Sequence, residues 1–291
     1  MMRAERERAW AKLNLSLDVL APMPDGYHGM KMLMQSCSLC DELRVSLTPD
    51  GSFLAHSNLY YLPSDSRNIT VKAAKLFMEE LGETHFGVRI DMKKRIPVCA
   101  GLGGGSADAA AVLRALNRLM HAGLSAARLE ELGLRLGADV PFCIQGGTCL
   151  AEGRGELLTP LAPMPDCGIV ICKPRFPIST PELFSRIDSR SPGGEPDTPA
   201  LISALERGDL AALAGGMRNV FEQVLSPEHG EIFEIRHRLI SAGALGAMMS
   251  GTGSAVFGIF SGIQEARSCA RLLGRDYREC YFAQPTGRLQ V

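Results

Sequence analysis

A glycine-rich segment in the middle of the chain has the composition of a phosphate-binding loop. Four of the five residues from 101 to 105 are glycine, and they lie between a predicted strand and a predicted helix. Glycine lets backbone amides approach an anion closely, and the amides at a helix N-terminus attract phosphate. A simple connector would need fewer glycines, because each one loses conformational entropy on folding. We therefore predict a loop that holds phosphate through its backbone.

Common phosphate-loop motifs do not fit this segment. No Gly-Lys-Ser/Thr closes it, as a Walker A loop requires. Ser106 falls where the last glycine of a GxGxxG dinucleotide fingerprint should be. The HRD and DFG motifs of protein kinases are also absent from the sequence. The loop therefore indicates another class of phosphate-binding protein.

Two polar side chains follow the glycines. The hydroxyl of Ser106 could cap the helix or could bind a phosphate-bridging Mg²⁺, and the sequence leaves both interpretations open. Asp108, in the first helical turn, is expected to complement the helix dipole. No Asp-x-Asp pair or other metal-ligand cluster occurs in the sequence, so Ser106 is the one metal ligand that it offers.

The elements that must position this loop follow from the hydrophobic pattern. Residues 11–19 alternate apolar and polar, which predicts a half-buried strand with Lys12, Asn14, Ser16 and Asp18 on one face. The pattern predicts further strands at 30–39, 42–48, 53–56 and 88–93, and helices at 68–81, 106–120 and 125–136. Asp139 is expected in the loop after the last of these helices.

The pattern changes after about residue 156 and indicates a second α+β unit. It predicts strands at 168–172, 244–249, 254–260 and 279–283, several helices between 181 and 240, and a helix at 263–273. Prolines make 189–199 the one linker-like stretch. We therefore expect an N-terminal domain at 1–155 and a C-terminal domain at 156–291.

Composition narrows the class of protein. The 291 residues are 46% hydrophobic and 22% charged, and no apolar run approaches the roughly 18 residues of a membrane span. A disordered chain, a collagen and a membrane protein are therefore not expected. The net charge of −1 offers no field for nucleic acid or acidic lipid. Residues 1–8 alternate acid and base, unlike a secretory signal, so we expect a cytoplasmic protein.

The nine cysteines do not have the pattern of a disulfide framework. Their number is odd, and they are scattered through apolar stretches. Cys37 and Cys40 form one CxxC, but no second pair of zinc ligands accompanies it. We expect reduced thiols that are mostly buried, with zinc as the weaker alternative.

Three segments together resemble the GHMP kinase superfamily of small-molecule kinases. They are residues 11–15 (Ala-Lys-Leu-Asn-Leu), 97–107 and 249–254 (Met-Ser-Gly-Thr-Gly-Ser), in the family's order and spacing. The resemblance implies an α+β, two-domain GHMP kinase fold. In it an α/β nucleotide-binding N-terminal domain and a ferredoxin-like α+β C-terminal domain enclose the active site in a cleft. It also implies ATP as co-substrate, Mg²⁺, and direct transfer to a small-molecule hydroxyl as a monomer or homodimer.

Other segments narrow the resemblance within the family. Residues 24–28 (Pro-Asp-Gly-Tyr-His), 136–142 and 153–156 are similar to members that phosphorylate a cytidine diphosphate ester of a branched polyol in the non-mevalonate pathway of isoprenoid biosynthesis. The alternatives are homoserine, mevalonate or sugar kinases, and a nucleotide-binding regulator without activity. The sequence departs from the family pattern at three positions, where Trp10 replaces a proline, Cys99 a glycine and Gly29 an acid.

The resemblance implies a role for each motif residue. Asp139 would be the general base that takes a proton from the attacking hydroxyl, and Lys12 its charged partner. ATP would be bound by Lys94, in preference to Arg95, and by the loop residues Pro97, Val98, Cys99, Ala100, Gly101, Leu102, Gly103, Gly104, Gly105, Ser106 and Ala107.

The resemblance also implies a pocket for the cytidyl substrate. Tyr27 and Phe184 would stack on the cytosine ring, and His28 would hydrogen-bond its edge. Asn14 and Thr180 would hold the polyol and the cytidine. Ser250, Gly251 and Gly253 would form a tight turn that supports the phosphates and the substrate.

Overall fold

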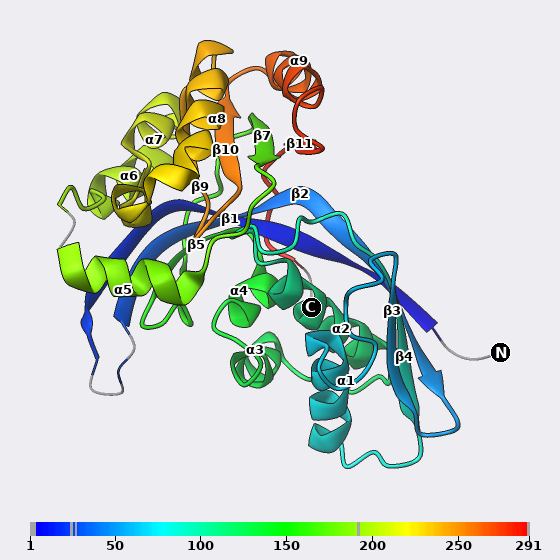
Figure 1. Cartoon of the computed structure of the whole chain (residues 1–291). Coiled ribbons are helices and arrows are strands. Elements are labelled where there is room, and N and C mark those ends of the chain that lie inside the picture. The colour runs from blue at the N-terminus through cyan, green and yellow to red at the C-terminus, as the bar shows by residue number, and fades with distance from the viewer. Residues whose placement is uncertain (1–3, 24–25, 27, 191–192, 290–291) are drawn as a thin grey trace.

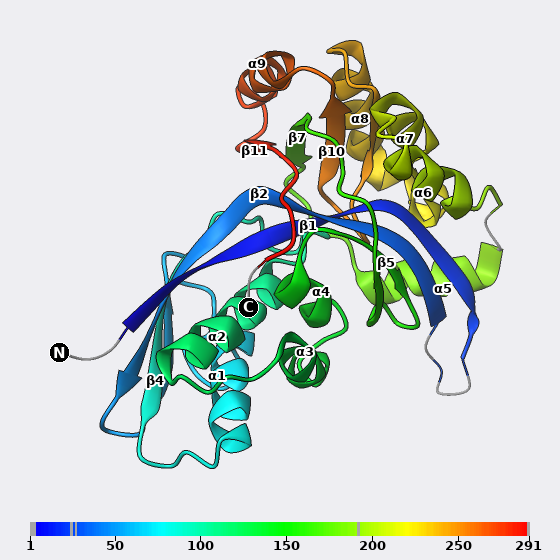
Figure 2. The same ribbon diagram turned by 180° about the vertical axis from the view of Figure 1, so that it is seen from behind.

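Two long antiparallel strands run across the whole molecule and connect its two lobes (Figure 1). The computed structural model describes residues 4–23, 26, 28–190 and 193–289. Strand β1 spans Ala4–Pro22 and strand β2 spans His28–Thr48. In both views the helices α1 to α4 lie on one side of this pair and the second sheet lies on the other (Figures 1 and 2).

The first sheet is built around β1 and β2. Its main path has the order β3-β4-β2-β1-β8, while β5 pairs with β2 and β6 pairs with β5. The other strands span β3 Phe53–Ser57, β4 Gly87–Lys93, β5 Thr148–Glu152, β6 Leu157–Pro160 and β8 Arg218–Asn219. Neighbours are antiparallel except for β3 with β4 and β1 with β8, which are parallel.

Four helices cover one face of this sheet. They are α1 Ile69–Glu80, α2 Gly104–Leu119, α3 Ala126–Leu134 and α4 Val140–Gln145. Side-chain caps from Asn68 and Ser125 accept amide hydrogen bonds at the starts of α1 and α3, which explains why the sequence places these starts well. The alanines at 109–111 are fully buried and let α2 pack closely on β1.

The second lobe has a four-stranded antiparallel sheet with the order β11-β7-β10-β9. Its strands are β7 Gly168–Lys173, β9 Gly246–Met249, β10 Val256–Phe260 and β11 Glu279–Ala283. Its helices are α5 Thr180–Arg190, α6 Thr198–Glu206, α7 Leu210–Gly216, α8 Gly230–Ser241 and α9 Ile263–Leu273, with short 3-10 turns at Val220–Val224 and Pro227–His229. This strand order is that of the ferredoxin-like fold that the resemblance implied.

The first sheet also takes in segments from later in the chain. Strand β6 lies beyond residue 155 and yet extends the first sheet through β5, and β8 joins it beside β1. After β11 the chain returns to the first lobe, where Thr286 donates an amide hydrogen bond to the carbonyl of Ser36 at 2.9 Å. The chain therefore crosses between the lobes several times, and two continuous domains meeting at 155 and 156 stay a prediction.

Several sequence-based expectations differ from the structure. The predicted strands 30–39 and 42–48 are one continuous strand, β2. The segment 11–18 of β1 is buried on both faces, because the second lobe covers the polar face that the alternation marks as exposed. Strands β5, β6 and β8 and helix α4 were not predicted, since each is too short to show a period.

The cysteines are all unpaired, and seven of the nine are buried. Burial raises the pKa of the Cys37 thiol to about 12, as expected for an inert core thiol.

Within the described part of the chain, no set of three or more His, Cys, Asp or Glu side chains is placed to hold a metal. Among the same residues, no helix combines the length and apolar character needed to cross a bilayer.

Cys99 is exposed and has a φ of 52°, in the left-handed region that favours glycine. This backbone geometry gives a physical reason for the glycine that is usual at this position.

Cys99→Gly should therefore raise the free energy of unfolding by about 0.5–1 kcal/mol, because a left-handed conformation is unfavourable for residues with a Cβ. Chemical denaturation measures the change. His121→Gly relieves the same strain at φ 52° outside the loop and is the matched control. An unchanged or lower stability of Cys99→Gly, with His121→Gly stabilised, would contradict this explanation.

Candidate active site

The glycine loop lies between β1 and the turn that joins β9 to β10. Gly101 has a φ of 72°, and a Cβ built on it would lie 1.9 Å from the carbonyl oxygen of Ser250. The Ser250 hydroxyl donates to the Gly101 carbonyl at 3.0 Å, and the Ala255 amide donates to the Ala100 carbonyl at 3.1 Å. On the other side, the Lys12 amide donates to the Leu102 carbonyl at 3.0 Å. These contacts fix the loop backbone between the two lobes.

A cavity of 440 Å³ opens onto this loop. Its floor is formed by residues 96–106, and its walls include the apolar side chains of Leu62, Ile69 and Met92. A larger cavity of 910 Å³ adjoins it and shares Lys94, Ile96 and Val98 with it. The site thus combines an apolar wall with a row of backbone amides.

Helix α2 begins at Gly104, two residues before the expected start. Gly103, at a φ of 67°, occupies the N-cap position and makes no side-chain cap bond. The interpretation of Ser106 as the helix cap is therefore wrong, since Ser106 already lies in the first turn. Ser106 is one of the residues that line the cavity.

Lys94 lines the cavity but is held by two carboxylates. Its ammonium pairs with Asp41 and Asp108, and all three groups are buried. The Asp41 carboxylate also accepts from the Ile96 amide at 2.8 Å, next to the loop. In this structure the Lys94 charge is paired inside the protein and anchors the entry to the loop, so its direct contact with nucleotide phosphate stays a prediction.

Asp108 likewise differs from its expected role at the helix dipole. It is buried against Lys94, and its Oδ1 has no hydrogen-bond partner among the described residues. Burial raises the pKa of Asp108 to about 8, against the opposing effect of the Lys94 charge. The two aspartates and Lys94 together tie α2 to β2 and to the loop.

Lys12 and Asp139 lie together beside the loop. Lys12 Nζ is 3.5 Å from Asp139 Oδ2, although 127 residues separate them along the chain. The lysine side chain is 6% exposed, whereas that of Asp139 is 32% exposed and accessible to a ligand. A Cβ on Gly103 would lie 2.8 Å from Lys12 Cγ, so the loop needs glycine here for the lysine to pass.

Asn14, whose contact with substrate stays a prediction, orients Lys12 in this structure. Its Oδ1 accepts from Lys12 Nζ at 2.7 Å, and its own exposed fraction is 0%. The backbone amide of Asn14 donates to the Ser250 hydroxyl at 3.3 Å. With no exposed surface, Asn14 has no atom that a substrate could contact in this arrangement.

Asp139 is the N-cap residue of α4, and its side chain makes no cap hydrogen bond. The sequence places it in a loop and does not predict α4. The signal for this helix was Pro141, in the first turn where proline is favoured. The Asp139 carboxylate accepts no cap hydrogen bond; it lies near Lys12 and is partly exposed to solvent.

His28 and Phe184, which lie far apart in the sequence, form a stacked pair. Their ring centroids are 5.3 Å apart with an interplanar angle of 28°. His28 Nε2 lies 2.7 Å from Asp188 Oδ1, and Phe184 meets Phe221 edge-on at 5.1 Å. Asp188 and Phe221 were not anticipated from the sequence, which gives no local signal for them. Tyr27 lies outside the described residues.

Thr180 and the turn at 250–253 meet at the open side of the site. Thr180 Oγ1 lies 2.9 Å from Thr252 Oγ1. The turn is held from behind by Asn219, whose Nδ2 donates to the carbonyls of Met249 and Gly251 at 2.9 and 2.8 Å. Gly251 and Gly253 have φ values of 57° and 81°. Asn219 is a supporting residue that sequence reasoning missed.

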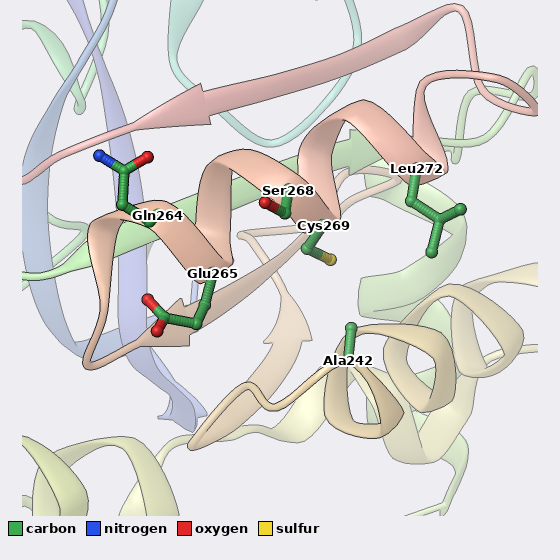
Figure 3. Close-up of a pocket in the computed structure, with 6 residues that line it drawn as sticks. All are labelled: Ala242, Gln264, Glu265, Ser268, Cys269 and Leu272. Carbon is green, nitrogen blue, oxygen red and sulfur yellow. The ribbon is translucent and has the colours of Figure 1, made fainter.

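A separate hollow of 460 Å³ lies on the second lobe, against α9 and the end of α8 (Figure 3). It is lined by Ala242, Gln264, Glu265, Ser268, Cys269 and Leu272. None of the predicted catalytic or binding residues lines it.

Two models of known protein families match this chain. The family model described as GHMP kinases N terminal domain matches residues 68–147, and the model described as GHMP kinases C terminal matches residues 201–277. The first contains the glycine loop and Asp139, and the second contains Asn219 and the turn at 250–253.

Two relatives and one solved structure that are similar over nearly the full chain have the same enzyme name. A 4-diphosphocytidyl-2-C-methyl-D-erythritol kinase of Clostridium botulinum is 42% identical over 95% of this chain and 98% of its own. One of Alkaliphilus metalliredigens is 40% identical over 99% of this chain and 98% of its own. A crystal structure of 4-(cytidine 5'-diphospho)-2C-methyl-D-erythritol kinase superposes with a TM-score of 0.81 at 36% identity, covering 97% of this chain and 100% of that one. The chain therefore belongs to the GHMP kinases and, within them, to the family of 4-diphosphocytidyl-2-C-methyl-D-erythritol kinases.

Proposed function

We propose that this enzyme transfers the γ-phosphoryl group of ATP to the 2-hydroxyl of 4-diphosphocytidyl-2-C-methyl-D-erythritol, giving ADP and the 2-phosphate in isoprenoid biosynthesis. The observation that carries the proposal is the Lys12–Asp139 pair, 3.5 Å apart at the edge of a glycine-loop cavity. The names of the relatives supply the substrate, and the site supplies a base, a cation and a phosphate cradle.

ATP would occupy the 440 Å³ cavity with its phosphates on the loop. The amides at the start of α2 are free to donate to phosphate oxygens, and the helix dipole favours negative charge there. Leu62, Ile69 and Met92 offer an apolar wall for the base. Binding through backbone amides needs no excess of basic residues, which fits a chain with a net charge of −1.

Asp139 would act as the general base. Its exposed carboxylate can accept the proton of the 2-hydroxyl as that oxygen attacks the γ-phosphorus, so that the P–O bond to ADP breaks as the new one forms. Lys12 stabilises the negative charge that develops on the attacking oxygen. Asn14 holds the Lys12 ammonium at 2.7 Å, so the cation is in place before the substrate binds. Transfer is direct, without a phosphoenzyme.

Mg²⁺ would be held mainly by the ATP phosphates. No protein cage of carboxylates is found among the described residues, which suits an ion that keeps water and phosphate ligands. The Ser106 hydroxyl is a hard oxygen donor that lines the cavity and fits as one protein ligand. When bound, the ion would neutralise charge on the transferring phosphoryl group.

The stacked His28 and Phe184 would bind the cytosine ring. Phe184 gives an apolar face, and Asp188 fixes the orientation of the His28 ring through Nε2, which leaves Nδ1 for the edge of the base. Thr180, beside the turn at 250–253, would contact the cytidyl polyol. Tyr27 remains a predicted stacking residue.

Removing either member of the Lys12–Asp139 pair should abolish most of the activity. Lys12→Ala and Asp139→Asn should each lower kcat by about 10²- to 10⁴-fold, because a positioned base and its cation act on the transition state. A coupled assay of ADP release measures kcat. The exposed side chains of Lys72 and Asp166 provide matched controls, Lys72→Ala and Asp166→Asn, which should keep full activity. Near wild-type kcat in both pair variants would refute the mechanism.

Removing an aromatic face should weaken binding of the cytidyl substrate selectively. Phe184→Ala should raise KM for that substrate by about 5- to 100-fold, since stacking on a base contributes roughly 1–3 kcal/mol. KM for ATP should stay within about threefold, because Phe184 does not line the 440 Å³ cavity. Phe86→Ala, at an exposed position of the other lobe, is the control. Equal changes in the two KM values, or turnover of homoserine or mevalonate instead, would contradict this assignment.

A further inference from the structure

Arg114 is the largest side chain that is wholly buried in this protein's described residues, at 1% exposed. It lies on α2 among apolar residues and takes no part in the chemistry proposed above. A buried guanidinium is unfavourable unless its donors are satisfied, because its charge is removed from water. Burial lowers the pKa of Arg114, and the nearby Glu7 carboxylate opposes that effect. Its partners therefore indicate what it holds together.

The partners of Arg114 belong to two different elements. One end of the guanidinium, Nη1, donates to the carbonyl of Cys143 in α4 at 2.6 Å. The other, Nη2, donates to the carbonyl of Arg8 in β1 at 3.1 Å and lies 3.3 Å from Glu7 Oε1. A planar guanidinium presents these donors in a rigid fork. Arg114 thus joins α4 to β1 across the helix that carries it, and Figure 2 shows α2 and α4 side by side next to β1.

These two elements carry the reacting pair. The Cys143 amide donates to the carbonyl of Asp139 at 3.1 Å, so Cys143 lies one helical turn after the base. Arg8 precedes Lys12 by four residues on the same strand. Helix α4 has only six residues and cannot hold a position alone. The end of α4 has further anchors, since the Gln145 carbonyl accepts from the Leu289 amide at 2.9 Å and Gln145 Nε2 donates to Glu130 Oε1 at 3.2 Å.

We propose that Arg114 is a positioning residue for phosphoryl transfer, which sets the distance between Asp139 and Lys12 by fixing α4 to β1. The proposal rests on the function proposed above, in which Asp139 is the base. A shift of about 1 Å in a reacting group lowers rate by roughly 10²-fold, so a loosened α4 should reduce kcat without weakening substrate binding equally.

Arg118 provides a matched control on the same helix. It also pairs with Glu7, one turn after Arg114, but among the described residues it has no hydrogen bond or ion pair with α4. Its side chain is 38% exposed. Loss of the Arg118 side chain removes a charge and one partner of Glu7. It leaves the hydrogen bond from Arg114 to the Cys143 carbonyl in place.

The first measurement compares Arg114→Met with Arg118→Met. Methionine fills a similar volume without the donors. Arg114→Met should lower kcat by about 10- to 100-fold, with KM for ATP and for the cytidyl substrate within about threefold. Arg118→Met should keep kcat within about twofold. Thermal unfolding checks that the assay temperature leaves both variants folded. Full kcat in Arg114→Met, or equal losses in the two variants, would overturn the proposal.

A double-mutant cycle separates positioning of the base from general damage. If Arg114 acts through Asp139, then adding Arg114→Met to Asp139→Asn should lower kcat by less than about threefold further, because the base is already lost. If the two losses multiply, Arg114 does not act through Asp139 and the proposal fails. Full activity of Asp139→Asn alone would instead refute the proposed function, so the two failures are distinguishable.

Arg114→Lys carries the same test if the methionine variant does not fold. Lysine keeps the charge and reaches one carbonyl, but it lacks the fork that spans two elements. We expect its kcat to lie between those of wild type and Arg114→Met, or about tenfold below wild type if only the lysine variant folds. The reduction in kcat caused by Arg114→Lys should also disappear when Asp139→Asn is already present. Wild-type kcat in Arg114→Lys, or a loss that multiplies with that of Asp139→Asn, would overturn the proposal.

Discussion

The ammonium group of Lys12 lies inside the protein, 2.7 Å from Asn14 Oδ1 and 3.5 Å from Asp139 Oδ2. A buried charge is tolerated only when polar groups surround it, so this part of β1 must be enclosed by partners. Asn14 meets that need from the same strand. Asp139 meets it from α4, where its carboxylate is also open to a substrate. The same contacts that make the lysine's burial possible create the pair that we propose to be catalytic.

The enclosure of Lys12 explains why the second lobe lies against β1. Strand β8 pairs with β1 at Ser16 and Leu17, and the turn at 250–253 packs on the glycine loop. Asn219, next to that pairing, holds the turn through two backbone carbonyls. The loop, the lysine and the turn therefore form one rigid unit. Preorganised donors of this kind need little rearrangement when phosphate arrives.

Sequence reasoning predicted much of the fold and most of the residues that gather at the site. The bounds of α9 and β11 were predicted to the residue, because both are regular and bounded by turn residues. The glycine loop, Lys12 and Asp139 were also predicted, and the structure brings them together. Sequence reasoning missed α4 and β8, which are too short for a periodic signal, and it treated the polar face of β1 as exposed.

The sequence by itself determined where phosphate can approach the backbone, since four glycines at a helix start have that property in any context. Only the tertiary structure decided which charged groups are free. Lys94 is neutralised by Asp41 and Asp108, Asn14 is buried beneath Lys12, and Arg114 joins β1 and α4, which carry Lys12 and Asp139. The physical reason is that a charge's partners come from segments far away along the chain, whereas local periodicity records only which way a side chain faces.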